Sequence, residues 1–287
     1  MKASHLTVTS QLKSPQFWLL ATGAGCIAIH LTLTWRSGNS SLLGMSVLLW
    51  AAISSLIWEK RHNLKLESGI FSSFFGLTLI ALLLFKSISL TSFGVFLYLS
   101  PAIFALGLAL LASGFKGLKQ YKGELFVLFF LSVPKVLASL FPDISPLTAK
   151  FAGFVLWYTG FEVDQNGTLI NLPTGSVEVY PGCSGVELIF QLLSLALLFF
   201  LMFPQNWKRK IIVTIMAALL AFIVNGLRVA LMAILVAQQQ MTAFDYWHEG
   251  EGSLVFSLIT VLLFGLFCWF LVGRNELRNK EATESSK

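Results

Sequence analysis

Residues 181–203 read PGCSGVELIFQLLSLALLFFLMF, a proline–glycine turn followed by an apolar run in which Glu187 is the only charged residue. Such a run approaches the roughly 20 apolar residues that a helix needs to cross a bilayer core. The whole 287-residue chain is similar, because 56% of its residues are hydrophobic and 12% are charged. Soluble domains carry about 25% charged residues. The sequence therefore predicts an all-α polytopic membrane protein without a separate soluble domain.

Further apolar segments extend this prediction to about eight transmembrane helices within one integral membrane domain, residues 1–287. The third segment is short, and Pro101 interrupts the fourth. The predicted spans cover residues 16–35, 41–58, 69–85, 92–113, 124–142, 184–203, 211–237 and 252–273.

The distribution of lysine and arginine predicts the orientation, because cytoplasmic loops carry an excess of both residues. With the N-terminus inside, fifteen of the twenty lysines and arginines fall in inside segments and three in outside segments. We therefore expect a multi-pass protein of the plasma (inner) membrane, with the N-terminus and the tail at 274–287 in the cytoplasm. The net charge of +6 reflects this orientation, and no nucleic-acid partner is expected.

The long outside segment, residues 143–183, is predicted to hold an interfacial or re-entrant helix and a small extracytoplasmic β element. Its first part, SPLTAKFAGFVLWYTGF (145–161), is apolar and aromatic but too short to cross comfortably. Asn166-Gly167 between β-prone residues indicates a hairpin turn. SVEVY at 176–180 alternates as a third strand would, directly before the sixth span.

Cys183 is the one cysteine in a polar, turn-like setting, and it is the candidate nucleophile. Cys26 and Cys268 lie inside apolar runs, where a cysteine is usually a small buried hydrophobe. The sequence has no CxxC pair or His/Cys cluster with zinc-like spacing. We therefore expect neither a metal nor a cofactor.

The residues after Cys183 predict a helix cap. Ser184-Gly185-Val186-Glu187 reads S-x-x-E, a capping box in which Ser184 and Glu187 each bond the other's backbone N–H. The N–H groups of Gly185 and Val186 have no partner within the helix, and the helix dipole favours negative charge. Both effects favour a thiolate at Cys183 and can stabilise an oxyanion. The alternative is an inert interfacial cysteine beside an ordinary cap.

Arg228, in AFIVNGLRVALMAIL (221–235), is a second candidate. It lies roughly 26 Å along the seventh span, toward the side where Cys183 emerges. Asn225 is three residues earlier and shares its helical face. An arginine among apolar residues of a spanning helix is costly, which favours a functional role. The alternatives are snorkelling to the outer interface and a structural ion pair with Glu187.

His248, in DYWHEGEGSLVF (245–256), is the third candidate, in the outside loop before the eighth span. Histidine is suited to general acid–base catalysis near neutral pH. Asp245, Glu249 or Glu251 could orient it. The alternative is a solvated loop histidine beside an interfacial Tyr-Trp pair. Together Cys183, Arg228 and His248 fall at one face of the membrane, and a thiol, a base and a cation suit acyl transfer.

Three short motifs in this order resemble the exosortase/archaeosortase family: PGCSGVELIFQLL, NGLR at 225–228, and His248, Gly252 and Phe256 within HEGEGSLVF. They cover mainly residues 177–260. The YPGCSG form is most similar to the cyanobacterial branch, the cyanoexosortases. It departs from other branches, which often have an acidic or small residue before the cysteine.

The resemblance implies a membrane cysteine protease or transpeptidase that processes exported proteins with a C-terminal sorting signal. Such a signal has a short motif, typically Pro-Glu-Pro (PEP-CTERM), then a membrane span and a basic tail. Mapped by motif, Cys183 is the nucleophile that forms a thioacyl intermediate, His248 the acid/base, and Arg228 the oxyanion stabiliser. Transfer to a lipid or exopolysaccharide precursor is implied as the release step. The active site then lies on the extracytoplasmic side, where the hairpin at 161–180 is a candidate reader of the motif.

Two other functions fit the sequence. A carrier or flippase would use Arg228 to bind an anionic lipid or sugar phosphate in exopolysaccharide export, and Cys183 would be dispensable. A non-catalytic subunit of a polysaccharide export system would need these residues only for assembly.

Overall fold

The computed structural model describes residues 14–88, 94–136, 142–248 and 250–284. The chain forms two compact units, Met1–Val136 and Leu137–Lys287, and each is described by itself. Within these residues the secondary structure is helical apart from one small sheet, and several helices are long and apolar enough to cross a membrane. The prediction of an all-α polytopic membrane protein is therefore confirmed.

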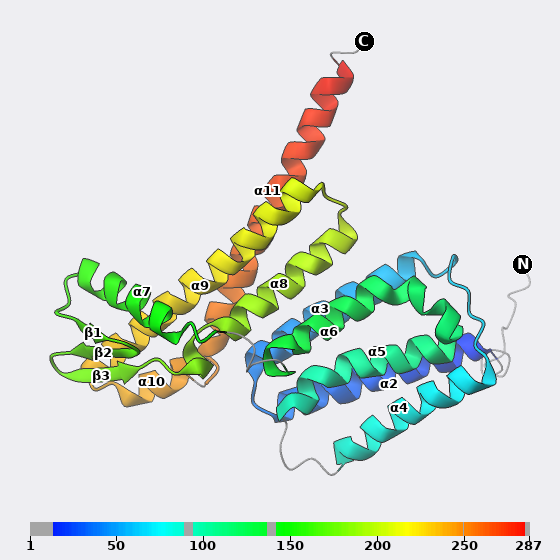
Figure 1. The fold of residues 1–287 in the computed structure, drawn as a ribbon, viewed down its shortest axis with the longest axis horizontal. Helices are drawn as coiled ribbons and strands as arrows, with labels where there is room; N and C mark the ends of the chain where they lie inside the picture. Colours follow the sequence, from blue (N-terminus) through cyan, green and yellow to red (C-terminus); the bar gives the residue numbers. More distant parts are fainter. Residues whose placement is uncertain (1–13, 89–93, 137–141, 249, 285–287) are drawn as a thin grey trace, which may run out of the picture. The chain divides into compact units, whose positions relative to one another are not determined.

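The first unit is built around α5 (Gly94–Gly117), which packs against three other helices of the unit. Its remaining elements are α2 (Pro15–Arg36), α3 (Ser40–Glu59), α4 (Ile70–Ile88), the 3₁₀ turn η1 (Leu118–Tyr121) and α6 (Lys122–Val136) (Figure 1). Gly76 of α4 and Gly107 of α5 let the two backbones touch, since a Cβ on Gly76 would lie 2.6 Å from the Gly107 carbonyl oxygen. Small residues at a crossing are the usual means of close helix packing in membranes.

Seven stretches qualify as candidate spans among the described residues, where about eight helices were expected. The difference lies in one 39-residue stretch, Gly94–Ser132, which contains α5 and most of α6. Gly114 leaves the helical conformation with φ +63°, and η1 follows, so that α6 turns back and packs against α5. The predicted fourth and fifth spans are thus two separate helices. The end of the fifth prediction, at 137–141, lies outside the described residues.

The second unit combines three long helices with a smaller α/β element. Its long helices are α8 (Val186–Met202), α9 (Trp207–Ala237) and α11 (Ser253–Glu284), and the short α10 (Met241–His248) joins α9 to α11 (Figure 1). A core that includes Leu192, Ala217 and Phe264 holds the long helices together. The backbone of α11 stays helical to Glu284, so the predicted tail at 274–287 begins as an extension of the last helix.

The α/β element packs on the C-terminal part of α9. It contains α7 (Ser145–Tyr158) and the antiparallel strands β1 (Asp164–Asn166), β2 (Leu169–Leu172) and β3 (Gly175–Glu178), in the order β1-β2-β3. The predicted hairpin is present, but its turn is Gly167-Thr168, one residue later than expected, with Gly167 at φ +62°. The third strand ends two residues earlier than the predicted SVEVY stretch. Ile170, Val179 and Ala233 are among the buried residues that fix this element to α9.

The helix α7 carries exposed aromatic residues, including Phe154 and Trp157. Its other side packs so closely against α9 that a Cβ on Gly226 would overlap the ring of Phe151. The position of α7 relative to a membrane, interfacial or re-entrant, stays a prediction.

Candidate active site

Cys183 ends a 3₁₀ turn, η3 (Pro181–Cys183), and α8 begins three residues later. The predicted capping box is wrong. The residue that caps α8 is Gly185, at φ +90°, and it has no side chain to accept a hydrogen bond. The hydroxyl of Ser184 instead donates to the Pro181 carbonyl at 2.7 Å, and the Val186 N–H approaches the same hydroxyl oxygen at 3.4 Å. Ser184 therefore closes the turn that carries the thiol.

Two side chains from other helices hold the backbone beside the thiol. The Asn225 side-chain N–H of α9 donates to the Cys183 carbonyl at 2.9 Å. The Thr148 hydroxyl of α7 donates to the Ser184 carbonyl at 2.7 Å. A Cβ on Gly185 would lie 2.7 Å from the Asn225 amide nitrogen, so only glycine fits there. Asn225, predicted as a supporting residue, is thus in direct contact with the backbone of Cys183, the candidate nucleophile.

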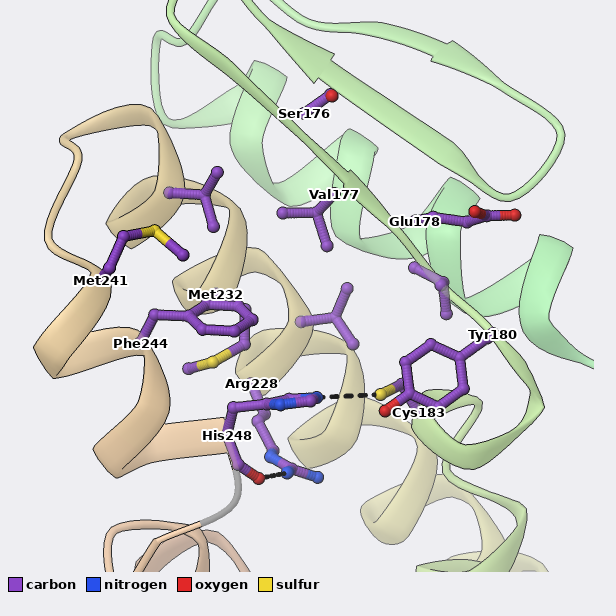
Figure 2. Close-up of a pocket in the computed structure, with 13 residues that line it drawn as sticks. Ser176, Val177, Glu178, Tyr180, Cys183, Arg228, Met232, Met241, Phe244 and His248 are labelled. Carbon is purple, nitrogen blue, oxygen red and sulfur yellow. Dashed lines mark hydrogen bonds between the residues drawn. The ribbon is translucent and has the colours of Figure 1, made fainter.

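The structure brings Cys183 and His248 together, with 3.2 Å between Sγ and Nε2 (Figure 2). The expectation of a loop histidine is wrong, because His248 is the last residue of α10. The ring of Phe244, one turn earlier, stacks on the imidazole at 4.9 Å between centroids. Tyr180 approaches the same ring edge-on at 6.4 Å. The imidazole is therefore held between two aromatic rings, with one nitrogen at the thiol.

Arg228 approaches the same pair from α9. Its Nη2 donates to the main-chain carbonyl of His248 at 2.6 Å, as Figure 2 shows. Among the described residues nothing accepts a hydrogen bond from its buried Nε–H. The guanidinium also interacts electrostatically with Cys183, Tyr180 and Glu187. Arg228 thus points into the site, as expected for a functional role, and its position relative to a membrane interface stays a prediction.

Cys183, Arg228 and His248 border one cavity of about 280 Å³. Its walls come from β3 and the residues after it, from α9 and from α10 (Figure 2). The apolar residues of these walls that sequence analysis missed include Met232, Met241 and Phe244. The spacing of Phe244 four residues before His248 was an available signal, since residues i and i+4 share a face once that stretch is helical. Thr148 had no comparable signal.

The residues after His248 shape the turn into α11. The Gly252 N–H donates to the Tyr246 carbonyl at 3.2 Å, and a Cβ on Gly252 would lie 2.7 Å from the Tyr246 ring. The Phe256 ring packs edge-on against Trp247 at 5.8 Å. Gly252 and Phe256 of the third motif therefore contact Tyr246 and Trp247, the two residues before His248, and so help to position His248.

A thiol and an imidazole in contact, beside a guanidinium and at one end of a bundle of apolar helices, define a membrane protein with a cysteine–histidine site. The family model described as Transmembrane exosortase (Exosortase_EpsH) matches residues 35–265. The match covers most of the chain, and the chain belongs to the exosortase family. Curated proteins and solved structures give no match. The resemblance found from the motifs is confirmed for the family, and the cyanobacterial branch stays a prediction.

Proposed function

We propose that the protein is a cysteine peptidase or transpeptidase that cleaves a C-terminal sorting signal of exported proteins through a thioacyl intermediate. Membership of the exosortase family supports a membrane sorting transpeptidase in general. The observation that carries the finer proposal is the 3.2 Å contact between Cys183 Sγ and His248 Nε2 at the wall of a cavity. A nucleophile within hydrogen-bond reach of a base is the arrangement that acyl transfer requires.

In the first step His248 takes the proton of the Cys183 thiol, and the thiolate sulfur attacks the carbonyl carbon of the scissile peptide bond. The carbonyl becomes a tetrahedral oxyanion. As this intermediate collapses, the C–N bond breaks, and the imidazolium of His248 gives its proton to the departing amine. The acyl part of the substrate is left as a thioester on Cys183.

In the second step a water or an acceptor nucleophile attacks the thioester. His248 takes the proton of the attacking group, the C–S bond breaks, and the Cys183 thiol is restored with that proton. Attack by water releases a cleaved protein. Attack by a nucleophile on a lipid or exopolysaccharide precursor transfers the protein to that acceptor.

Arg228 has two parts in this scheme. Its Nη2–H holds the His248 carbonyl, which positions the imidazole. Its Nε–H is buried and has no acceptor among the described residues, and the residue lines the same cavity as Cys183 and His248. A buried donor without a partner costs free energy, and a developing oxyanion is a partner that arises only during reaction. The dipole at the start of α8 favours negative charge at the same place.

The substrate in this proposal carries a short motif outside the membrane, a spanning segment and a basic tail inside. This places the site on the extracytoplasmic side of the plasma membrane, with both termini in the cytoplasm, as the lysine and arginine bias predicts.

The test is to trap the acyl enzyme. Wild-type protein mixed with a tagged sorting-signal substrate is expected to yield a Cys183 peptide heavier by the acyl fragment in mass spectrometry, and Cys183→Ala is expected to accumulate uncleaved substrate. Cys268→Ala is the matched control, since Cys268 is a buried free thiol in the core of the long helices. Normal cleavage by Cys183→Ala would exclude the peptidase, and a carrier that needs Arg228 alone would then be favoured.

A further inference from the structure

We propose that the free edge of β3 binds the substrate polypeptide as an added β-strand, which leads the scissile bond to Cys183. The inference rests on the peptidase function proposed above and specifies how the substrate backbone is held. The strand order is β1-β2-β3, so β3 is an outer strand with β2 as its neighbour in the sheet. The opposite edge of β3 borders the cavity that contains the thiol.

The register of the sheet identifies the backbone groups at this edge. The Val179 N–H donates to the Thr168 carbonyl at 2.9 Å, so Val179 bonds toward β2. In an antiparallel pair, residues that bond to the neighbouring strand alternate with residues that do not. Val177 therefore also bonds toward β2, whereas the N–H and C=O groups of Ser176 and Glu178 point away from it. These are the groups that a further strand would use.

The cavity is lined along this edge from Ser176 of β3 to Cys183 and His248, and this part of the cavity is called the groove below. Met241 and Phe244 of α10 lie across from β3, and Met232 of α9 lies beside Phe244, toward His248 (Figure 2). An extended peptide offers backbone groups to the strand edge and every second side chain to such walls. The backbone bonds would hold substrates of different sequence, and the apolar walls would select the side chains. The occupant that fits is an extended segment with apolar side chains facing α10.

The groove also assigns a direction to this segment. Gly175, at the start of β3, lies against Val236 near the end of α9, whereas Cys183 lies at the start of α8. In the proposed substrate the spanning segment follows the scissile bond, so the residues before that bond extend from Cys183 toward Gly175. The added strand then runs parallel to β3.

A proline substitution tests the edge directly, because proline removes one N–H and keeps an extended backbone. Ser176→Pro removes a donor that β2 does not use. We expect it to cleave a tagged sorting-signal substrate roughly tenfold more slowly than Ser176→Ala, which lacks the hydroxyl but keeps the N–H. Alkylation of Cys183 by iodoacetamide is expected to keep its rate, since this reagent needs no strand. Gln165→Pro, at the outer edge of β1, is the matched control and should cleave normally.

Disulfide trapping gives a second measurement that does not depend on proline. Single cysteines are placed along the substrate before the scissile bond and paired with Ser176→Cys in the Cys183→Ala background. An added strand predicts cross-links at alternate substrate positions, because side chains of a strand alternate between two faces. Cross-links at consecutive positions, or cleavage by Ser176→Pro at the rate of Ser176→Ala, would overturn the inference. Neither result would contradict the proposed peptidase function, which is contradicted only if Cys183→Ala cleaves the tagged substrate.

Discussion

Arg228 donates a hydrogen bond to the main-chain carbonyl of His248 at 2.6 Å, and so a buried cation on α9 holds the residue whose imidazole contacts the thiol. The bond uses the last carbonyl of α10, an acceptor that the helix itself leaves free. Arg228 thus has two effects. It positions the residue that carries the imidazole, and it places a positive charge in the cavity that Cys183 and His248 line.

Arg228→Lys tests this double role. Lysine keeps the charge but carries its three N–H donors on one nitrogen, which does not reproduce a guanidinium that holds the His248 carbonyl through Nη2 and offers a separate Nε–H to an oxyanion. We expect cleavage of a tagged substrate to slow by roughly 10²-fold, as for loss of an oxyanion donor. Arg209→Lys, near the start of the same helix, is the control. Unchanged cleavage by Arg228→Lys would show that a positive charge alone is enough.

His248→Gln tests the base. Glutamine can hydrogen-bond to the thiol but cannot take its proton near neutral pH, so cleavage should fall by about 10²- to 10⁴-fold. The rate at which iodoacetamide alkylates Cys183 should fall in parallel, because the thiolate is the reactive form. His62→Gln, at an exposed turn after α3, serves as the matched variant. Alkylation of Cys183 at the wild-type rate in His248→Gln would argue against activation by this histidine.

Gly185→Ala tests the tight contact behind the thiol. The new Cβ would lie 2.7 Å from the Asn225 amide nitrogen, at a backbone φ of +90° that already disfavours alanine. Gly160→Ala has a similar φ, +95°, with open space around the Cβ, and so carries only the backbone cost of about 1–2 kcal/mol. We expect Gly160→Ala to lower the unfolding temperature in detergent slightly, and Gly185→Ala to lower it more and abolish cleavage. Equal effects would mean that the Asn225 contact yields easily.

Gly226→Ala tests the packing of α7 on α9. Its Cβ would overlap the ring of Phe151, so the two helices must separate. Gly25→Ala, in a helix with nothing within 4 Å of the new Cβ, should be neutral or stabilising by about 0.5–1 kcal/mol. We expect Gly226→Ala to lower both the unfolding temperature and the cleavage rate. A variant as stable and active as Gly25→Ala would show that Phe151 relaxes into free space.

The helical fold could be predicted because apolar runs of spanning length leave few alternatives, since lipid gives unpaired backbone groups no partner. The break near Gly114 could also be predicted, because the lysines at 116, 119 and 122 separate the fourth apolar run from the fifth. The helix that ends at His248 was missed. MTAFDYWH has only eight residues, and its apolar side chains line a cavity with residues of β3 and α9 that are distant in the sequence, so the segment alone gives little helical signal.

Within the site, the sequence was enough to identify Cys183, Arg228 and His248 and to predict that they lie at the same end of the helices. It was not enough to predict the local geometry around Cys183. Ser184 and Glu187 have the spacing of a capping box, but Gly185 between them can adopt a positive φ. Tertiary contacts favour the glycine cap, since Asn225 and Thr148 bond the two carbonyls directly before Gly185. A local pattern cannot register partners that lie 36 and 42 residues away.

Side chains of α9 and α7 bond the carbonyls of Cys183 and Ser184, whereas the imidazole that contacts the thiol belongs to α10. Of these three helices, α10 is the last along the chain. During synthesis the ribosome therefore delivers the thiol well before its base. A nascent chain that stops short of Met241 has the backbone of Cys183 with both of its supports but no histidine to activate the thiol. Under the proposed function, cleavage would therefore begin only after α10 has been synthesised and has brought His248 to Cys183.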